Sequence, residues 1–124
     1  MKSINIKATS STPAVIFLPK EGKIEIIGRS IPENAIEFYE ELYKEVDEYL
    51  KQPHKLTEAI IQLDYFNSSS SVSILNILKL LKQIYNNGFE VNVKWIYEEY
   101  DDDILNAGKN YQTILNIPFQ FIEI

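Results

Sequence analysis

The sequence has no cysteine, and it has only one arginine among its 124 residues. Without cysteine the chain can form no disulfide framework, no thiolate metal site and no thiol nucleophile. A reducing cytoplasm suits this composition, and we expect the protein there. The net charge of −6 and the single guanidinium, on Arg29, argue against a protein that binds the phosphate backbone of nucleic acid, because such affinity depends largely on clustered Lys and Arg. We therefore expect no nucleic-acid partner.

Long apolar runs are absent as well. No stretch approaches the length of about 18 apolar residues that indicates a membrane span, and the N-terminal segment lacks the apolar part of a signal peptide. We expect neither a membrane segment nor secretion. With 45% hydrophobic and 24% charged residues, the composition is that of an ordinary globular protein, and the length fits a single domain over residues 1–124.

The most informative stretch is 59–71, which reads AIIQLDYFNSSSS. Its first half has the apolar body of a strand, and Asn67 then interrupts the pattern before four consecutive serines. From Ile74 onward, apolar residues recur at intervals of three and four, which is the spacing of one helix face. The pattern predicts a strand, a tight polar corner, and a helix that begins at Ser68 or Ser69.

The other periodicities predict alternating strands and helices. The expected elements are strands at 4–8, 15–18, 24–27, 59–66, 90–97 and 119–124, with helices at 35–50, 68–87 and 104–115. The turn at 19–22 predicts an antiparallel hairpin, whereas strand–helix–strand crossovers make the later strands parallel. The fold class is therefore α/β, with one mixed, mostly parallel sheet, an N-terminal antiparallel hairpin and covering helices.

Several single residues support more specific expectations. Ser30 and Glu33 have the spacing of a capping box for the first helix. Gly108 is expected to weaken the third helix. His54 has no cysteine or second histidine beside it, so we expect it in a solvent-exposed loop. The apolar face of the first helix and the core are expected to include Ile36, Tyr39, Tyr43, Tyr49 and Trp95.

Two polar corners follow neighbouring strands of the predicted sheet. The serine corner, Asn67–Ser71, follows the central strand, and the acidic corner, Tyr97–Asp103, follows the next one. The carboxyl ends of parallel strands share one edge of a sheet, so we expect the corners to be neighbours. The carboxylates at 101–103 suit the positive end of a helix dipole, an interpretation we favour over a binding role. Adjacent helical residues point in different directions and no EF-hand spacing is present, so we expect no metal site.

The serine corner allows two interpretations. At the start of a helix the backbone N–H groups lack partners within the helix, and the dipole favours negative charge. A hydroxyl at this position can cap the helix, which is the usual role of serine there. It can also accept a phosphoryl group, and the pattern alone leaves both interpretations open.

Three blocks of the sequence resemble the SiaC family of bacterial regulatory phosphoproteins, and together they cover almost the whole chain. They are Thr12-Pro13 with Val15, Phe17 and Gly22, followed by Ile26-x-Gly28-x-Ser30-x-Pro32-Glu33-Asn34 and Phe38-Tyr39; Tyr65-Phe66-Asn67-Ser68-Ser69-Ser70; and Asn92-x-x-Trp95-x-Tyr97 with Asp101 and Asp103. The family is similar to STAS domains, the fold of anti-anti-sigma factors, which carry a phosphorylatable Ser or Thr at a strand-to-helix corner. The resemblance therefore implies a single SiaC/STAS-like domain.

The resemblance also implies a non-enzymatic switch without a cofactor. A cognate Ser/Thr kinase and a PP2C-like phosphatase would set the phosphorylation of Ser68, with Ser69 as the alternative if the register slips. The unphosphorylated form would bind and stimulate a diguanylate cyclase in c-di-GMP signalling. The residues expected to contact the partner are Asn67, Ser69, Val72, Tyr97, Asp101 and Asp103.

The chain departs from the family's pattern at several positions. Ser68 stands where threonine is usual, which preserves the hydroxyl, and the departures that concern the partner's identity are Leu18, Val72, Asn106 and Lys109. The sequence leaves two alternative functions open: a STAS-like antagonist that binds an anti-sigma kinase, and a metal-dependent enzyme that uses the acidic corner. No histidine lies in either corner and no glycine-rich phosphate loop follows a strand, which disfavours the enzyme.

Overall fold

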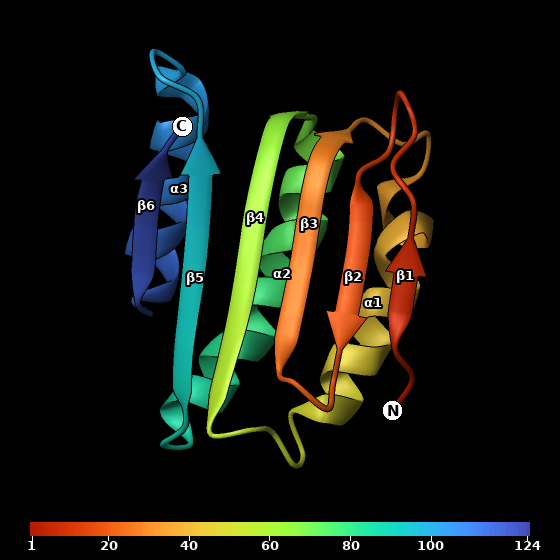
Figure 1. Cartoon of the computed structure of the whole chain (residues 1–124), viewed down its shortest axis with the longest axis vertical. Coiled ribbons are helices and arrows are strands. Elements are labelled where there is room, and N and C mark those ends of the chain that lie inside the picture. The colour runs from red at the N-terminus through yellow and green to blue at the C-terminus, as the bar shows by residue number, and fades with distance from the viewer.

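Six strands form one mixed sheet in the order β1 to β6 in the computed structural model, which describes all residues 1–124 (Figure 1). The strands are β1 (Ile4–Ile6), β2 (Ala14–Leu18), β3 (Lys23–Ser30), β4 (Leu56–Phe66), β5 (Glu90–Tyr97) and β6 (Phe119–Glu123). The helices are α1 (Ala35–Tyr49), α2 (Ser68–Asn86) and α3 (Asp102–Leu115). Strands β1 to β3 pair antiparallel, and β3 to β6 pair parallel, as predicted.

All three helices lie on one face of the sheet. Each of them connects two neighbouring parallel strands, and each crossover advances by one strand in the same direction. A constant hand of crossover then places every helix on the same side, which is behind the sheet in Figure 1. No helix covers the other face. None of the three helices is long and apolar enough to cross a membrane.

The core lies between this helical layer and the sheet, and Trp95 is buried in it as predicted. The indole Nε1 of Trp95 donates a hydrogen bond to the carbonyl oxygen of Ile104 (2.8 Å), which ties β5 to the first turn of α3. Gly108 stands over the same ring, where an added Cβ would lie 2.6 Å from indole atoms. The expectation that Gly108 weakens α3 therefore misses its role, because the glycine lets α3 approach Trp95.

The predicted capping box at Ser30 and Glu33 is wrong. Helix α1 begins at Ala35, and its cap is Asn34, whose side-chain oxygen accepts a hydrogen bond from the N–H of Glu37 (3.1 Å). Ser30 is the last residue of β3, and its buried hydroxyl bonds other side chains. Capping-box spacing is a local signal, and here the strand continues past the point where that signal occurs.

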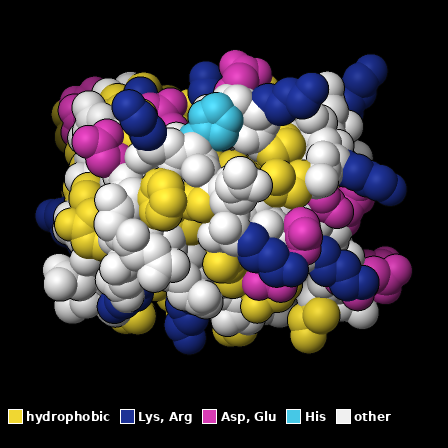
Figure 2. Space-filling view, turned by 90° about the horizontal axis from the view of Figure 1, so that it is seen from below, with side chains coloured by type: hydrophobic (Ala, Val, Ile, Leu, Met, Phe, Trp, Pro, Cys, Tyr) yellow, Lys and Arg dark blue, Asp and Glu magenta, His cyan; other side chains and the backbone are white.

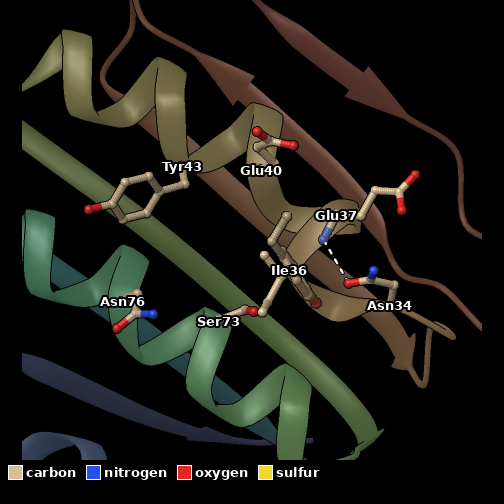
Figure 3. A pocket seen from close by; sticks show the side chains of 8 residues that line it. Asn34, Ile36, Glu37, Glu40, Tyr43, Ser73 and Asn76 are labelled. Carbon is tan, nitrogen blue, oxygen red and sulfur yellow. Dashed lines mark hydrogen bonds between the residues drawn. The ribbon is translucent and has the colours of Figure 1, made fainter.

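The predicted apolar face of α1 is correct for Tyr39 and Tyr49, which are buried, and wrong for Ile36 and Tyr43. Ile36 is 78% exposed and Tyr43 is 40% exposed. These two residues lie on the flank of α1 that borders α2, beside the face that lies on the sheet (Figure 3). His54 is exposed as predicted, at the opposite end of the sheet from the serine corner, where lysines and carboxylates are interspersed around it (Figure 2).

Candidate functional site

Helix α2 begins at Ser68, as the sequence predicted, and Asn67 caps it. The side-chain oxygen of Asn67 accepts hydrogen bonds from the N–H of Ser70 (3.0 Å) and from the hydroxyl of Ser69 (3.3 Å). Because Asn67 supplies the cap, the helix start needs no serine hydroxyl for that purpose. The hydroxyl of Ser68 is exposed and makes no hydrogen bond within the chain.

Ser70 points into the protein and belongs to a buried chain of hydroxyl groups. Its hydroxyl donates to the carbonyl oxygen of Ser30 (3.1 Å) and accepts from the hydroxyl of Ser30 (2.8 Å). The Ser30 hydroxyl in turn lies 2.6 Å from the phenol oxygen of Tyr39, which is left to act as the donor. Burial raises the pKa of Tyr39 to about 12, so this phenol keeps its proton at neutral pH. Ser70 is therefore shielded from modification.

Ser71 is half-buried and connects α2 to α3. The phenol of Tyr111 donates to the carbonyl oxygen of Ser71 (2.9 Å), and the Ser71 hydroxyl lies 3.0 Å from the same phenol oxygen. Burial raises the pKa of Tyr111 as well. Of the four consecutive serines, only Ser68 and Ser69 are exposed. Ser68 alone has a hydroxyl that is both exposed and free of protein partners.

The Ser30 hydroxyl connects Tyr39 to Ser70 in the buried chain of hydroxyl groups, which gives a testable prediction. We expect Ser30→Ala to lower the free energy of unfolding by about 1–3 kcal/mol, because it leaves the phenol of Tyr39 buried without an acceptor. Urea denaturation measures the change. Tyr39→Phe should cost less, since the Ser30 hydroxyl still donates to Ser70. A loss for Ser30→Ala no larger than that of an exposed serine, such as Ser69→Ala, would contradict the prediction.

The raised pKa of Tyr39 predicts a loss of stability in alkali. Its phenol ionises near pH 10 when unfolded and near 12 when folded, so the unfolded chain releases this proton first as the pH rises. The stabilising contribution is complete below pH 10 and is lost as the pH rises toward about 12. Urea midpoints measured across this window should fall, and Tyr39→Phe should fall less steeply. Parallel curves for the two proteins would disprove the prediction.

The acidic corner begins α3, so its carboxylates lie at a helix start as predicted. Asp101 caps the helix, and its side-chain oxygen accepts a hydrogen bond from the N–H of Ile104 (3.1 Å). Asp102 and Asp103 occupy the first turn, where negative charge suits the helix dipole. Nowhere in the chain do three or more carboxylate, histidine or cysteine side chains converge as metal ligands.

The two corners are neighbours, as predicted. Pairing between β4 and β5 ends at Ile61 and Trp95, so the strands diverge toward their carboxyl ends. A cavity of about 300 Å³ lies there, lined from one side by Phe66 and from the other by Asp101 and Asp103. Ser68 itself does not line this cavity.

The predicted contact residues form two groups at this edge of the sheet. Ser69 and Val72 are exposed on α2, where Val72 has 59% of its surface accessible, and Asn67 is half-buried. The other group consists of Tyr97, Asp101 and Asp103 at the acidic corner. The residues that hold the inner serines in place, Ser30, Tyr39 and Tyr111, were not predicted, because a contact between positions 40 apart leaves no local pattern.

Comparison with known proteins identifies this arrangement. The family of SiaC regulatory phosphoproteins matches residues 6–124. The chain belongs to the SiaC family. This result confirms the resemblance found in the three sequence blocks, and it places the chain among regulatory proteins rather than enzymes.

Solved SiaC structures support the assignment. SiaC of Pseudomonas aeruginosa is 26% identical and superimposes with a TM-score of 0.90 over 100% of both chains. The crystal structure of the diguanylate cyclase SiaD with its activator SiaC, from the same organism, contains a chain that is 26% identical, with a TM-score of 0.91 over 98% of this chain and 99% of that one. A protein of P. aeruginosa strain UCBPP-PA14 is 27% identical over 119 residues, which is 96% of this chain and 94% of the relative.

Three departures from the SiaC pattern lie on the surface of the helical layer, and one of them is Val72 on α2. Asn106 and Lys109 are exposed on α3, one turn or more beyond the acidic corner. Leu18, by contrast, is half-buried at the end of β2.

Proposed function

We propose that this SiaC-family protein is a non-enzymatic phosphorylation switch that controls a diguanylate cyclase in bacterial c-di-GMP signalling. A cognate Ser/Thr kinase phosphorylates Ser68, a PP2C-like phosphatase reverses the modification, and the unphosphorylated form binds and stimulates the cyclase in the cytoplasm. One observation supports this most directly. Ser68 is the only serine of the corner whose hydroxyl is exposed and free, while its three neighbours are hydrogen-bonded.

The switch requires no refolding of the domain. A phosphate adds about −1.5 to −2 charges at neutral pH, and the N-terminus of α2 stabilises them by about 0.3–1 kcal/mol. The acidic corner lies at the same sheet edge and opposes them through the repulsion of like charges. The cap at Asn67 and the bonds of Ser70 and Ser71 leave Ser68 outside the packing.

The docking surface in this proposal contains both groups of predicted contact residues at the sheet edge, together with Ser68. Ser69, Val72 and Asp103 are exposed, and Asn67, Tyr97 and Asp101 are half-buried. A hydrated dianion inside that surface must lose water when a partner docks, and it adds repulsion to any carboxylate opposite. The solved complex of SiaD with SiaC supports a cyclase as the partner over an anti-sigma kinase.

The modification itself can be tested with ATP and the cognate kinase. We expect intact mass to show a single added phosphate and fragment sequencing to locate it on Ser68. Ser68→Ala should gain no mass, whereas Ser69→Ala, a matched change at the other exposed serine, should still be phosphorylated. Phosphate on Ser69 in the unaltered protein, or no modification at all, would refute the assignment.

A further inference from the structure

A groove on the helical face is separate from the serine corner. It lies between α1 and α2, is open to solvent and has a volume of about 650 Å³. Ile36 and Tyr43 line it from α1, and Ser73 and Asn76 line it from α2. In Figure 3 the ring of Tyr43 extends from α1 toward Asn76, and Ile36 lies across from Ser73. A side chain as apolar and as exposed as Ile36 (78%) at the mouth of a groove is typical of an anchor point for a ligand or partner.

The charge around the groove is negative. Two carboxylates, Glu37 and Glu40, are among the lining residues, and no lysine or arginine is. Helix α1 carries six carboxylates and one lysine, so its net charge of −5 accounts for most of the chain's −6. That lysine, Lys44, pairs with Glu40 (2.9 Å) while both side chains remain largely exposed. An exposed pair of this kind is weak, so a cation from a partner can replace Lys44.

The shape of the groove selects the kind of partner. Two adjacent helices present a furrow into which the side-chain ridge of a third helix fits. No strand edge borders the groove, so an extended peptide finds no backbone to pair with. The groove also does not suit the α1 helix of a second copy of this chain, since α1 helices with a net charge of −5 repel one another.

We infer that the groove between α1 and α2 is a docking site for an amphipathic helix of another protein. The apolar side chains of that helix would contact Ile36 and Tyr43, and its basic side chains would pair with Glu37 and Glu40. The site goes beyond the proposed switch. Ser73, the first groove residue on α2, lies five positions after Ser68, which corresponds to a rise of about 7.5 Å along the helix. A phosphate on Ser68 would add negative charge outside the groove, so it would not repel a basic helix.

A pair of designed helical peptides tests the inference. Both carry leucines at positions i, i+3 and i+7 of one face, and they differ only in having arginines or glutamates on both flanks. We expect the arginine peptide to bind ¹⁵N-labelled protein and to shift the amide signals of Ile36, Tyr43, Ser73 and Asn76. By fluorescence anisotropy, the glutamate peptide should bind at least about tenfold more weakly. Added salt should weaken the binding of the arginine peptide, because it screens the attraction between the charges.

Matched variants separate the groove from the rest of the surface. Ile36→Asp should weaken the arginine peptide by about tenfold or more, while Ile114→Asp, at an isoleucine of α3 that is 57% exposed, should leave its affinity unchanged. Ser68→Asp should leave it unchanged or raise it slightly, since the added charge is negative and the peptide is basic. Equal binding of both peptides, no saturable binding, shifts confined to α3 or the uncovered sheet face, or a loss on Ser68→Asp would each overturn the inference.

The two proposals can fail independently. If the peptide binds the groove while the kinase leaves Ser68 unmodified, only the proposed switch is refuted. If Ser68 is phosphorylated and controls the cyclase while the peptide does not bind, only the proposed docking site is refuted. The peptide experiment uses neither kinase nor cyclase, so its result does not depend on the proposed function.

Discussion

Phosphorylation of Ser68 is expected to weaken binding of the cognate diguanylate cyclase by at least about a hundredfold, or roughly 3 kcal/mol. Two effects add to this loss. The dianion must be desolvated beside Val72 when a partner covers it, and it lies at the same sheet edge as the acidic corner, so negative charge accumulates there. Neither effect depends on a change of fold, so the far-UV circular dichroism of the modified protein should match that of the unmodified one.

Isothermal titration of the cyclase with the protein, before and after treatment with kinase, measures the change. Ser68→Ala is the decisive control, because it should bind the cyclase as the unmodified protein does and should keep that affinity after the same treatment. Ser68→Glu carries less charge than phosphate and should give a smaller loss. An unchanged affinity for protein shown by mass to be fully phosphorylated would disprove the switch.

Gly108→Ala is expected to destabilise the protein by about 1–3 kcal/mol, although alanine is the better helix former by about 1 kcal/mol. The new Cβ would lie 2.6–2.7 Å from three atoms of the Trp95 ring, closer than real Cβ atoms approach other heavy atoms. The ring cannot give way easily, because it is buried, packs against Tyr111 and Phe66, and is held by its hydrogen bond to Ile104. Crowding therefore outweighs helix propensity at this position.

Urea denaturation followed by fluorescence measures this effect, since Trp95 is the only tryptophan and reports on its own packing. Asn106→Ala, at an exposed position of the same helix, is the matched control and should be neutral or slightly stabilising. A shift in the emission of Trp95 should accompany the loss for Gly108→Ala. If Gly108→Ala proved as stable as the parent protein, the contact with Trp95 would not explain the glycine.

Most of the element order could be predicted because its signals are local. The change from alternation to a helical period after Asn67 located the start of α2 correctly, and the predicted end at residue 87 lies one position beyond the observed end at Asn86. The carboxylates of the acidic corner were likewise recognised as a helix start. Each of these signals depends on residues within a few positions of one another, so they can be detected from the sequence alone.

The errors have a different origin. Ser30 and Glu33 have the right spacing for a cap, but Ser30 remains in β3 because its hydroxyl finds partners in Tyr39 and Ser70. Ile36 and Tyr43 have the right spacing for the core, but the distance between α1 and α2 leaves that flank open. Periodicity identifies a face of a helix, and it does not tell how closely the neighbouring helix covers it.

The same distinction applies to the candidate site. The sequence was sufficient to predict several serine hydroxyls at the start of a helix, because capping and helical periodicity involve residues within one or two turns. It could not tell which of them faces solvent. Successive helical positions rotate by about 100°, and the phenols and the hydroxyl that hold Ser70 and Ser71 come from β3, α1 and α3, about 30 to 40 positions away. Only the packing of these distant elements leaves Ser68 free.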